Sequence, residues 1–219
     1  MASLVLLGWL SSSESASAAD KLVTIHRFAF ANGGYPDGRY PNGDLVIDAD
    51  GSIYGTTQEG GEACPGGQYS CGGTIFRLSP KGKSWKLNTL HSFTGGEKGA
   101  TPRAGLLLNS TGMLLGTTYY GGDADCRFET RGWGCGTIFA FGLPRRGFPK
   151  GKLFMLHAFS GDQDGRFPDN LLSMANETRV HGTTKLGAAT PAWLSRSSSS
   201  APTLTPPSPR PKAMTTSPG

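Results

Sequence analysis

Four cysteines fall in two pairs that occupy equivalent places in the chain, Cys64 with Cys71 and Cys126 with Cys135. Two thiols that bracket a short Gly-rich loop can form a disulfide or contribute to a metal site. These spacings lack the two-residue gap common in zinc sites, and no histidine lies beside the cysteines. If the chain is exported, the paired cysteines therefore predict two local disulfides.

Three histidines, His26, His91 and His157, recur at one position of a repeated phrase. A catalytic site needs different groups in different places, whereas here the same group returns. We therefore interpret the rings as structural, each bonded to the backbone of a neighbouring unit. The alternative is that the rings converge on an axis and bind a metal ion. We predict no catalytic, cofactor-binding or metal-binding residue among them.

Acidic residues that precede a glycine offer a calcium or glycosidase interpretation, namely Asp48 with Asp50 and Asp162 with Asp164. An EF-hand-like calcium loop would also need a bidentate glutamate downstream, which is not found at the required spacing. A turn needs only Asx and Gly, and the second unit has Asn109 where the first has Asp48. We therefore interpret these residues as turn formers.

The elements that must position these residues are the units of a tandem repeat. Gly-Thr-Thr occurs at 55–57, 116–118 and 182–184, and Gly-Thr-Ile-Phe follows at 73–76 and 136–139. His91 follows His26 by 65 residues, and His157 follows His91 by 66. This period fits four strands plus a cysteine-bearing insertion.

The composition favours an all-β fold. The 219 residues include 33 Gly and 15 Pro, which disfavour long helices, and short runs of aromatic, Thr and β-branched residues lie between them. We predict propeller-type blades of four antiparallel strands in tandem, with two full repeats and part of a third. The repeats are expected over 20–187, with units at about 22–88, 89–154 and 155–187.

The two ends of the chain differ from the repeats. Residues 1–19 combine an apolar run with small residues and resemble a secretory signal peptide. No later run is long enough for a transmembrane helix. Residues 188–219 are rich in Ser and Pro and carry no acidic residue, which predicts disorder. The repeat stops abruptly after Gly187, which indicates a frameshift; a genuine Ser/Pro linker is the alternative.

The recurring phrase, with Leu-His-x-Phe, Gly-Gly, Pro, an apolar strand, Gly-Thr-Thr and Gly-Thr-Ile-Phe, resembles the GloVer tandem repeat. The resemblance covers 22 to about 187. It implies a bacterial extracellular protein of the choice-of-anchor kind, export, and a β-propeller-like array, and it implies no established catalytic activity. The cysteine-bracketed insertions and the non-repeat tail depart from the family pattern.

We expect an exported, non-enzymatic repeat scaffold, secreted or at the cell surface, that serves adhesion or ligand binding. Loops on rigid scaffolds usually carry recognition, so Tyr119, Tyr120 and Trp133 are the candidate ligand contacts. Aromatic rings near Gly-rich loops can stack on sugars, which makes a carbohydrate the candidate partner. The net charge of +5 is scattered and accompanies no nucleic-acid module, so we expect no nucleic-acid partner.

Two alternatives belong to other classes. The first is an extracellular carbohydrate-active hydrolase or lyase on a propeller, for which Asp37, Asp123, Asp125 and Asp164 are the candidate carboxylates. The second is a truncated, non-functional gene product whose unpaired strand edges favour aggregation or assembly between chains.

Overall fold

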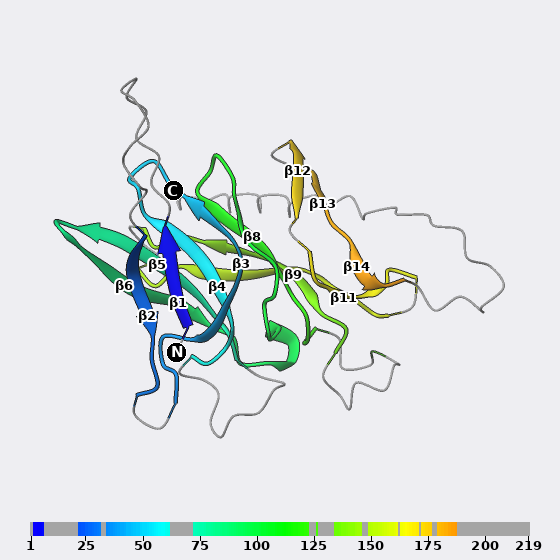
Figure 1. Cartoon of the computed structure of the whole chain (residues 1–219). Helices are drawn as coiled ribbons and strands as arrows, with labels where there is room; N and C mark the ends of the chain where they lie inside the picture. Colours follow the sequence, from blue (N-terminus) through cyan, green and yellow to red (C-terminus); the bar gives the residue numbers. More distant parts are fainter. Residues whose placement is uncertain are drawn as a thin grey trace, which may run out of the picture.

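The computed structural model is built of β-strands (Figure 1). It describes residues 2–6, 22–31, 34–61, 72–122, 126, 134–145, 149–161, 163–170, 172–176 and 179–187. Within these ranges the helical structure is a single 3-10 turn, η2 (Gly96–Lys98). In the same ranges, no helix has the length and apolarity needed to cross a membrane. The prediction of an all-β fold is confirmed.

The first large sheet has four antiparallel strands in the order β3-β4-β5-β6. The strands are β3 (Arg39–Ile47), β4 (Ile53–Glu59), β5 (Thr74–Lys81) and β6 (Ser84–Ser92). The expected Asp-Gly turn joins β3 to β4. Gly51 there has a φ of 74° and donates its N–H to the Asp48 carbonyl at 3.0 Å. Glycine accepts this left-handed conformation without steric cost.

The second large sheet repeats this arrangement in the order β10-β9-β8-β7. Its strands are β7 (Leu107–Leu108), β8 (Met113–Thr118), β9 (Thr137–Gly142) and β10 (Lys152–Ala158). In both sheets the Gly-Thr-Thr strand and the Gly-Thr-Ile-Phe strand lie side by side at the centre. The two most regular parts of the repeated phrase therefore pair with each other.

The sheets are offset from the units expected from the sequence. His91 lies on β6, the last strand of the first sheet, and His157 lies on β10, an edge strand of the second. The turn at Gly82 sends the chain back along β5, so the His-containing segment completes a sheet rather than starting one. A repeat period sets the length of a unit but not the residue at which its sheet begins.

Three smaller two-stranded sheets flank the large ones. They pair β1 (Ala2–Leu6) with β2 (Val23–Phe28), β11 (Arg166–Pro168) with β14 (Thr184–Leu186), and β12 (Ser173–Asn176) with β13 (Arg179–His181). The register of Pro168 opposite Thr184 matches that of Pro41 opposite Thr57, so the third unit corresponds to the β3–β4 part of the first. β1 lies within the segment expected to be an export signal. Among the described strands, no sheet closes on itself.

The described hydrophobic core has three clusters: one between β2 and the first large sheet, one between the first and second units, and one between the second and third. Successive residues of a strand point to opposite faces of its sheet. On β9, Phe139 and Phe141 therefore pack with Tyr54 of the first sheet, whereas Ile138 packs with Leu172 of the third unit. Each sheet depends on its neighbours to cover both of its faces.

Candidate functional site

Two of the recurring histidines form pairs with aspartates that follow them in the chain. Nε2 of His26 lies 3.1 Å from Oδ2 of Asp37, and Nε2 of His157 lies 2.9 Å from Oδ2 of Asp164. An ionised carboxylate only accepts hydrogen bonds, so Nε2 carries the proton and donates it. Sequence reasoning expected a backbone partner in a neighbouring unit, and the structure instead gives a side chain a few residues further along.

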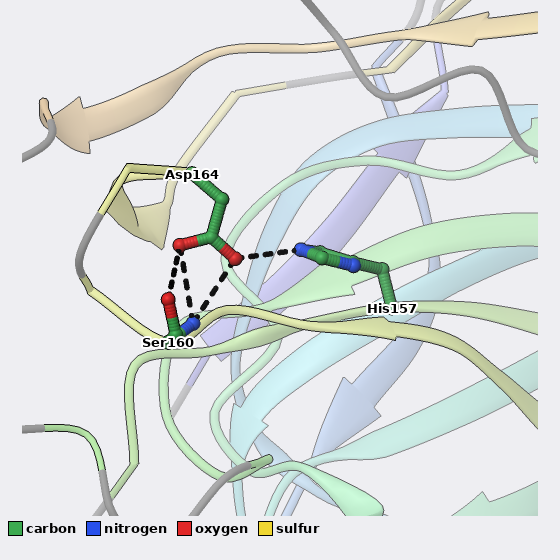
Figure 2. Close-up of polar contacts among 3 residues, drawn as sticks. All are labelled: His157, Ser160 and Asp164. Atoms are coloured by element: carbon green, nitrogen blue, oxygen red, sulfur yellow. Dashed lines mark hydrogen bonds and ion pairs between the residues drawn. The ribbon is translucent and has the colours of Figure 1, made fainter.

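The pair in the third unit is reinforced by a third residue, Ser160 (Figure 2). The Ser160 hydroxyl donates to Oδ1 of Asp164 at 2.7 Å, and the Ser160 backbone N–H donates to both carboxylate oxygens. Burial opposes ionisation of the Asp164 carboxyl. The hydrogen bonds from Ser160 and His157 outweigh burial and lower the pKa of Asp164 below its usual value. The carboxylate therefore fixes both the strand end and the turn after it.

The second unit departs from this pattern. His91 is followed by Lys98 at the same spacing that separates His157 from Asp164. Among the described residues, the buried Nε2 of His91 has no hydrogen-bond partner. Burial of the ring, reinforced by the positive charge of Lys98, lowers the pKa of His91 to about 4, so the ring is neutral at pH 7. A buried polar atom without a partner costs about 1–3 kcal/mol of stability.

The His91 ring is nonetheless placed as its counterparts are. It meets Phe93 edge-to-face with 4.8 Å between centroids, as His26 meets Phe28 at 4.8 Å and His157 meets Phe159 at 4.7 Å. The aromatic contact therefore orients all three rings alike. What distinguishes the second unit is the lysine at the sequence position of the aspartate, not the contact of the ring with its phenylalanine.

A large cavity opens beside His91, between the edge strands of the two large sheets. Its volume is about 1410 Å³, and it is lined by residues of β6 and β10 together with Phe141 of β9 and the η2 turn. Its charged lining residues within the described part of the chain are Arg77, Glu97, Lys98, Lys150 and Lys152. These four cations and one anion give the described lining a positive balance at neutral pH.

The recurring threonines are bonded to each other across the sheet. Oγ1 of Thr57 lies 2.8 Å from Oγ1 of Thr74, and Oγ1 of Thr118 lies 2.7 Å from Oγ1 of Thr137. Thr118 donates its hydroxyl proton to the Tyr120 carbonyl, so the other threonine donates within the pair. These hydroxyls tie the two central strands together at the end of Gly-Thr-Thr.

The acidic turns hold their own backbone. Oδ1 of Asp48 accepts the N–H groups of Asp50 and Ser52, each at 2.9 Å, and Oδ1 of Asn109 accepts those of Thr111 and Met113. An amide and a carboxylate therefore make the same turn, as the turn interpretation requires.

The Tyr54 hydroxyl donates to Oδ2 of Asp48, and burial together with this bond raises the pKa of Tyr54 to about 12. In the part of the chain that the structure describes, no three His, Cys, Asp or Glu residues form a group able to hold a metal ion.

One of the two predicted disulfides lies in the described part of the chain. Cys126 and Cys135 are joined, with 5.6 Å between their Cα atoms, and both side chains belong to the core cluster shared with the third unit. Cys64 and Cys71 lie outside the described residues. The confirmed disulfide anchors the end of the cysteine-bracketed loop to the hydrophobic core.

The aromatic residues expected to contact a ligand differ in their surroundings. The Tyr119 ring is 8% exposed, stacks on Phe167 at 4.9 Å and lies under the Arg103 guanidinium at 3.8 Å. Tyr120 is partly exposed, and burial, followed by the proximity of Tyr119, raises its pKa. Trp133 lies outside the described residues. Tyr119 therefore joins the second and third units together.

Sequence reasoning did not identify the His–Asp pairs or the cavity. The signal for the pairs is the Asp-Gly dipeptide at 37–38 and 164–165, which aligns with Lys98-Gly99 in the second unit. The cavity has no local signal, because it is formed where edge strands of two sheets meet.

A family model described as the Gloeobacter/Verrucomicrobia repeat matches residues 14–192. No curated protein and no solved structure matches the chain significantly. The match spans all three units with their Gly-Thr-Thr phrases and both large sheets. The chain belongs to the Gloeobacter/Verrucomicrobia repeat family.

Proposed function

We propose that the protein is an exported, non-enzymatic repeat scaffold that binds a carbohydrate outside the cell or at its surface. The observation that carries this proposal is the positively charged cavity between β6 and β10. It is lined by amide and hydroxyl groups, from Asn88, Thr89 and Ser92, beside the cationic side chains. A large concave site with a few convergent polar groups is the usual form of a ligand site.

The recurring residues support a role other than catalysis. The histidines of the first and third units each bind one aspartate, and the threonines bind each other. Asp37 and Asp164, which were candidates for a hydrolase, have the same partner type in both units. A hydrolytic site needs two carboxylates in different environments, and this repetition gives them similar ones.

The arrangement of cores supports a propeller-type stacking of the units. Each cluster contains the same phenylalanine of the phrase, Phe28, Phe93 or Phe159, next to the sheet that follows or precedes it. Blades of a propeller share their cores with neighbours in this way. The paired cysteines and the signal-like segment 1–19 support export, since disulfides persist in oxidising compartments.

Affinity electrophoresis of the full chain on a panel of polysaccharides tests this function. We expect retardation on at least one polysaccharide without cleavage of the polymer. Lys150→Glu/Lys152→Glu should abolish retardation, because it reverses the charge of the cavity wall. Lys81→Glu/Lys83→Glu, the same change at the exposed β5–β6 turn, should leave it intact. Retardation that is insensitive to both variants, or release of sugar products, would contradict the proposal.

A further inference from the structure

The second unit has a lysine where the other two units have an aspartate. In those units the carboxylate accepts the Nε2–H of the histidine, at 3.1 Å from His26 and 2.9 Å from His157. The ring of His91 keeps the same edge-to-face contact with its phenylalanine. Among the residues that the structure describes, its buried Nε2 lacks the hydrogen-bond partner that the aspartate supplies in the other two units.

The lysine at this position lowers the stability of the fold unless another group accepts the Nε2–H of His91. Buried polar atoms are nearly always bonded, and one that is not requires an explanation such as an external ligand. The recorded neighbours of the ring offer no strong acceptor: Phe93 and Phe141 pack against it, and the nearby Lys98 side chain has only donors. The sister units show by themselves which chemical group this position accepts.

The surroundings of His91 favour an anion that arrives from outside. His91 and Lys98 both line the cavity between β6 and β10, together with Arg77, Lys150 and Lys152. Glu97 is the one acidic residue among the described lining residues. Lys98 is exposed and has a flexible stem, so its ammonium group can accompany a ligand carboxylate toward His91.

We propose that the second unit binds a carboxylate of an acidic, uronic-acid-bearing oligosaccharide, with the Nε2–H of His91 and the ammonium of Lys98 as its donors. The ligand carboxylate takes the role that Asp37 and Asp164 fill in the other units. This inference rests on the proposed carbohydrate binding and assigns the sugar its acidic character and its point of contact.

An oligosaccharide fits the cavity better than an isolated small acid. The volume of about 1410 Å³ exceeds what a single carboxylate group needs, and the cations are distributed over β5, η2 and the β10 side. A chain of uronic acids carries one carboxylate per ring and so can meet several of these cations at once. Asn88 and Thr89 supply an amide and a hydroxyl for the sugar hydroxyl groups.

The test measures binding of tetragalacturonate to the full chain by isothermal titration calorimetry, beside its methyl ester and a tetraglutamate peptide. We expect the methyl ester and the peptide to bind at least tenfold more weakly than tetragalacturonate. Lys98→Asp restores the internal carboxylate of the sister units and should weaken tetragalacturonate binding at least tenfold. Lys83→Asp makes the same charge change at an exposed turn and should leave affinity within twofold.

Two further readouts keep the test decisive if Lys98→Asp does not fold. Lys98→Met removes the charge and should also weaken binding, while Lys83→Met should not. In the wild-type chain, the His91 Nε2 resonance should shift on addition of tetragalacturonate and its pKa should rise, while the His157 resonance should not move.

Each remaining outcome counts against a defined part of the proposal. Equal binding of tetragalacturonate and its methyl ester would overturn the carboxylate site and leave carbohydrate binding standing. Tighter binding of tetraglutamate would overturn the sugar class in favour of an acidic peptide. Absence of binding to all these probes and to neutral oligosaccharides would overturn both the site and the proposed function.

Discussion

Gly116 on β8 lies directly opposite Phe139 on β9, and a Cβ atom on Gly116 would come within 2.7 Å of the Phe139 Cζ atom. Gly55 has the same relationship to Phe76, at 2.6 Å. The phenylalanine ring therefore lies over the glycine in each large sheet. This explains why Gly-Thr-Thr and Gly-Thr-Ile-Phe occur together in the repeated phrase.

Gly116→Ala should destabilise the protein by about 1–3 kcal/mol, because the methyl group would displace Phe139 and the Leu106 side chain from a packed core. Urea unfolding followed by tryptophan fluorescence measures this. The control is Gly142→Ala on the neighbouring strand, where the nearest atoms lie 3.8 Å from the added Cβ. Similar losses of unfolding free energy in both variants would show that replacing any strand glycine destabilises the protein, whether or not a ring lies over it.

Thr118→Val should cost about 1–3 kcal/mol, since it removes the Thr118 oxygen that the buried Thr137 hydroxyl bonds and one of the two hydrogen bonds to the Tyr120 carbonyl, while keeping the shape of the side chain. Thr118→Ser retains the hydroxyl and should recover most of this loss. Chemical denaturation of the two variants gives the comparison. A Val variant as stable as the Ser variant would refute the role of the hydroxyl pair.

Asp164→Asn should destabilise the protein at pH 7 and have little effect near pH 2. The pKa of Asp164 is lowered in the folded state, so its contribution is present above the unfolded pKa and is lost as pH falls through the folded value. The carboxylate is partly exposed, so we expect a loss of only about 1 kcal/mol. Thermal unfolding from pH 7 to pH 2 follows it, with the exposed Asp44→Asn as the control. An effect that does not depend on pH would exclude the ionised carboxylate as the cause.

His91 should make the protein less stable as pH falls from about 6.5 toward 4. Its folded pKa is lowered to about 4, so between these values the unfolded state binds more protons and gains stability. The predicted loss across this window is about 1–3 kcal/mol. His91→Asn should flatten the stability profile there, and Lys98→Asp should flatten it as well, because an adjacent carboxylate raises the pKa of the ring. An unchanged slope in His91→Asn would assign the pH dependence to other groups.

Removing the Cys126–Cys135 disulfide, by Cys126→Ala/Cys135→Ala, should cost about 2–3 kcal/mol on the chain-entropy estimate for a short loop. Guanidinium unfolding of the oxidised wild type and the double variant measures this difference. Peptide mapping without reductant should recover the two cysteines in one cross-linked fragment. Free thiols at both positions in secreted protein would contradict the structure.

The repeated phrase predicts the strands well because its period is strict. Alternating apolar residues in Gly-Thr-Ile-Phe point to two different cores, and the Asp-Gly turn fixes the β3–β4 hairpin. The start of each sheet could not be predicted in the same way. The period of a repeat is the same whichever strand is counted first. Only the pairing of β6 with β5 shows that the His-containing strand is the last strand of a sheet.

The partners of the histidines are harder to find in the sequence. Asp164 follows His157 by 7 residues, but Asp37 follows His26 by 11, so an insertion hides the correspondence. The replacement by Lys98 hides it further. The His–Asp pairs can be recognised only in the folded structure, where the strand and the turn after it bring the carboxylate to the ring.

The backbone before each repeated proline could not be predicted either. Tyr40, Thr101 and Phe167 have φ values of 56°, 56° and 58°, a left-handed conformation that is rare for such side chains. Thr101 donates its N–H to the Gly72 carbonyl, and Phe167 donates to that of Cys135. Contacts between successive units therefore hold a conformation that local propensity disfavours.

We expect recognition to occur at the cavity between β6 and β10, where the second unit departs from the repeat. The most direct measurement is a ¹⁵N–¹H correlation spectrum of the full chain titrated with tetragalacturonate. We expect saturable shifts confined to the amides of 88–92, 96–98 and 150–155, while the amides of Ser160 and Asp164 in the third unit stay unmoved. Shifts centred on Tyr119 and Tyr120, or no shifts at millimolar ligand, would contradict it.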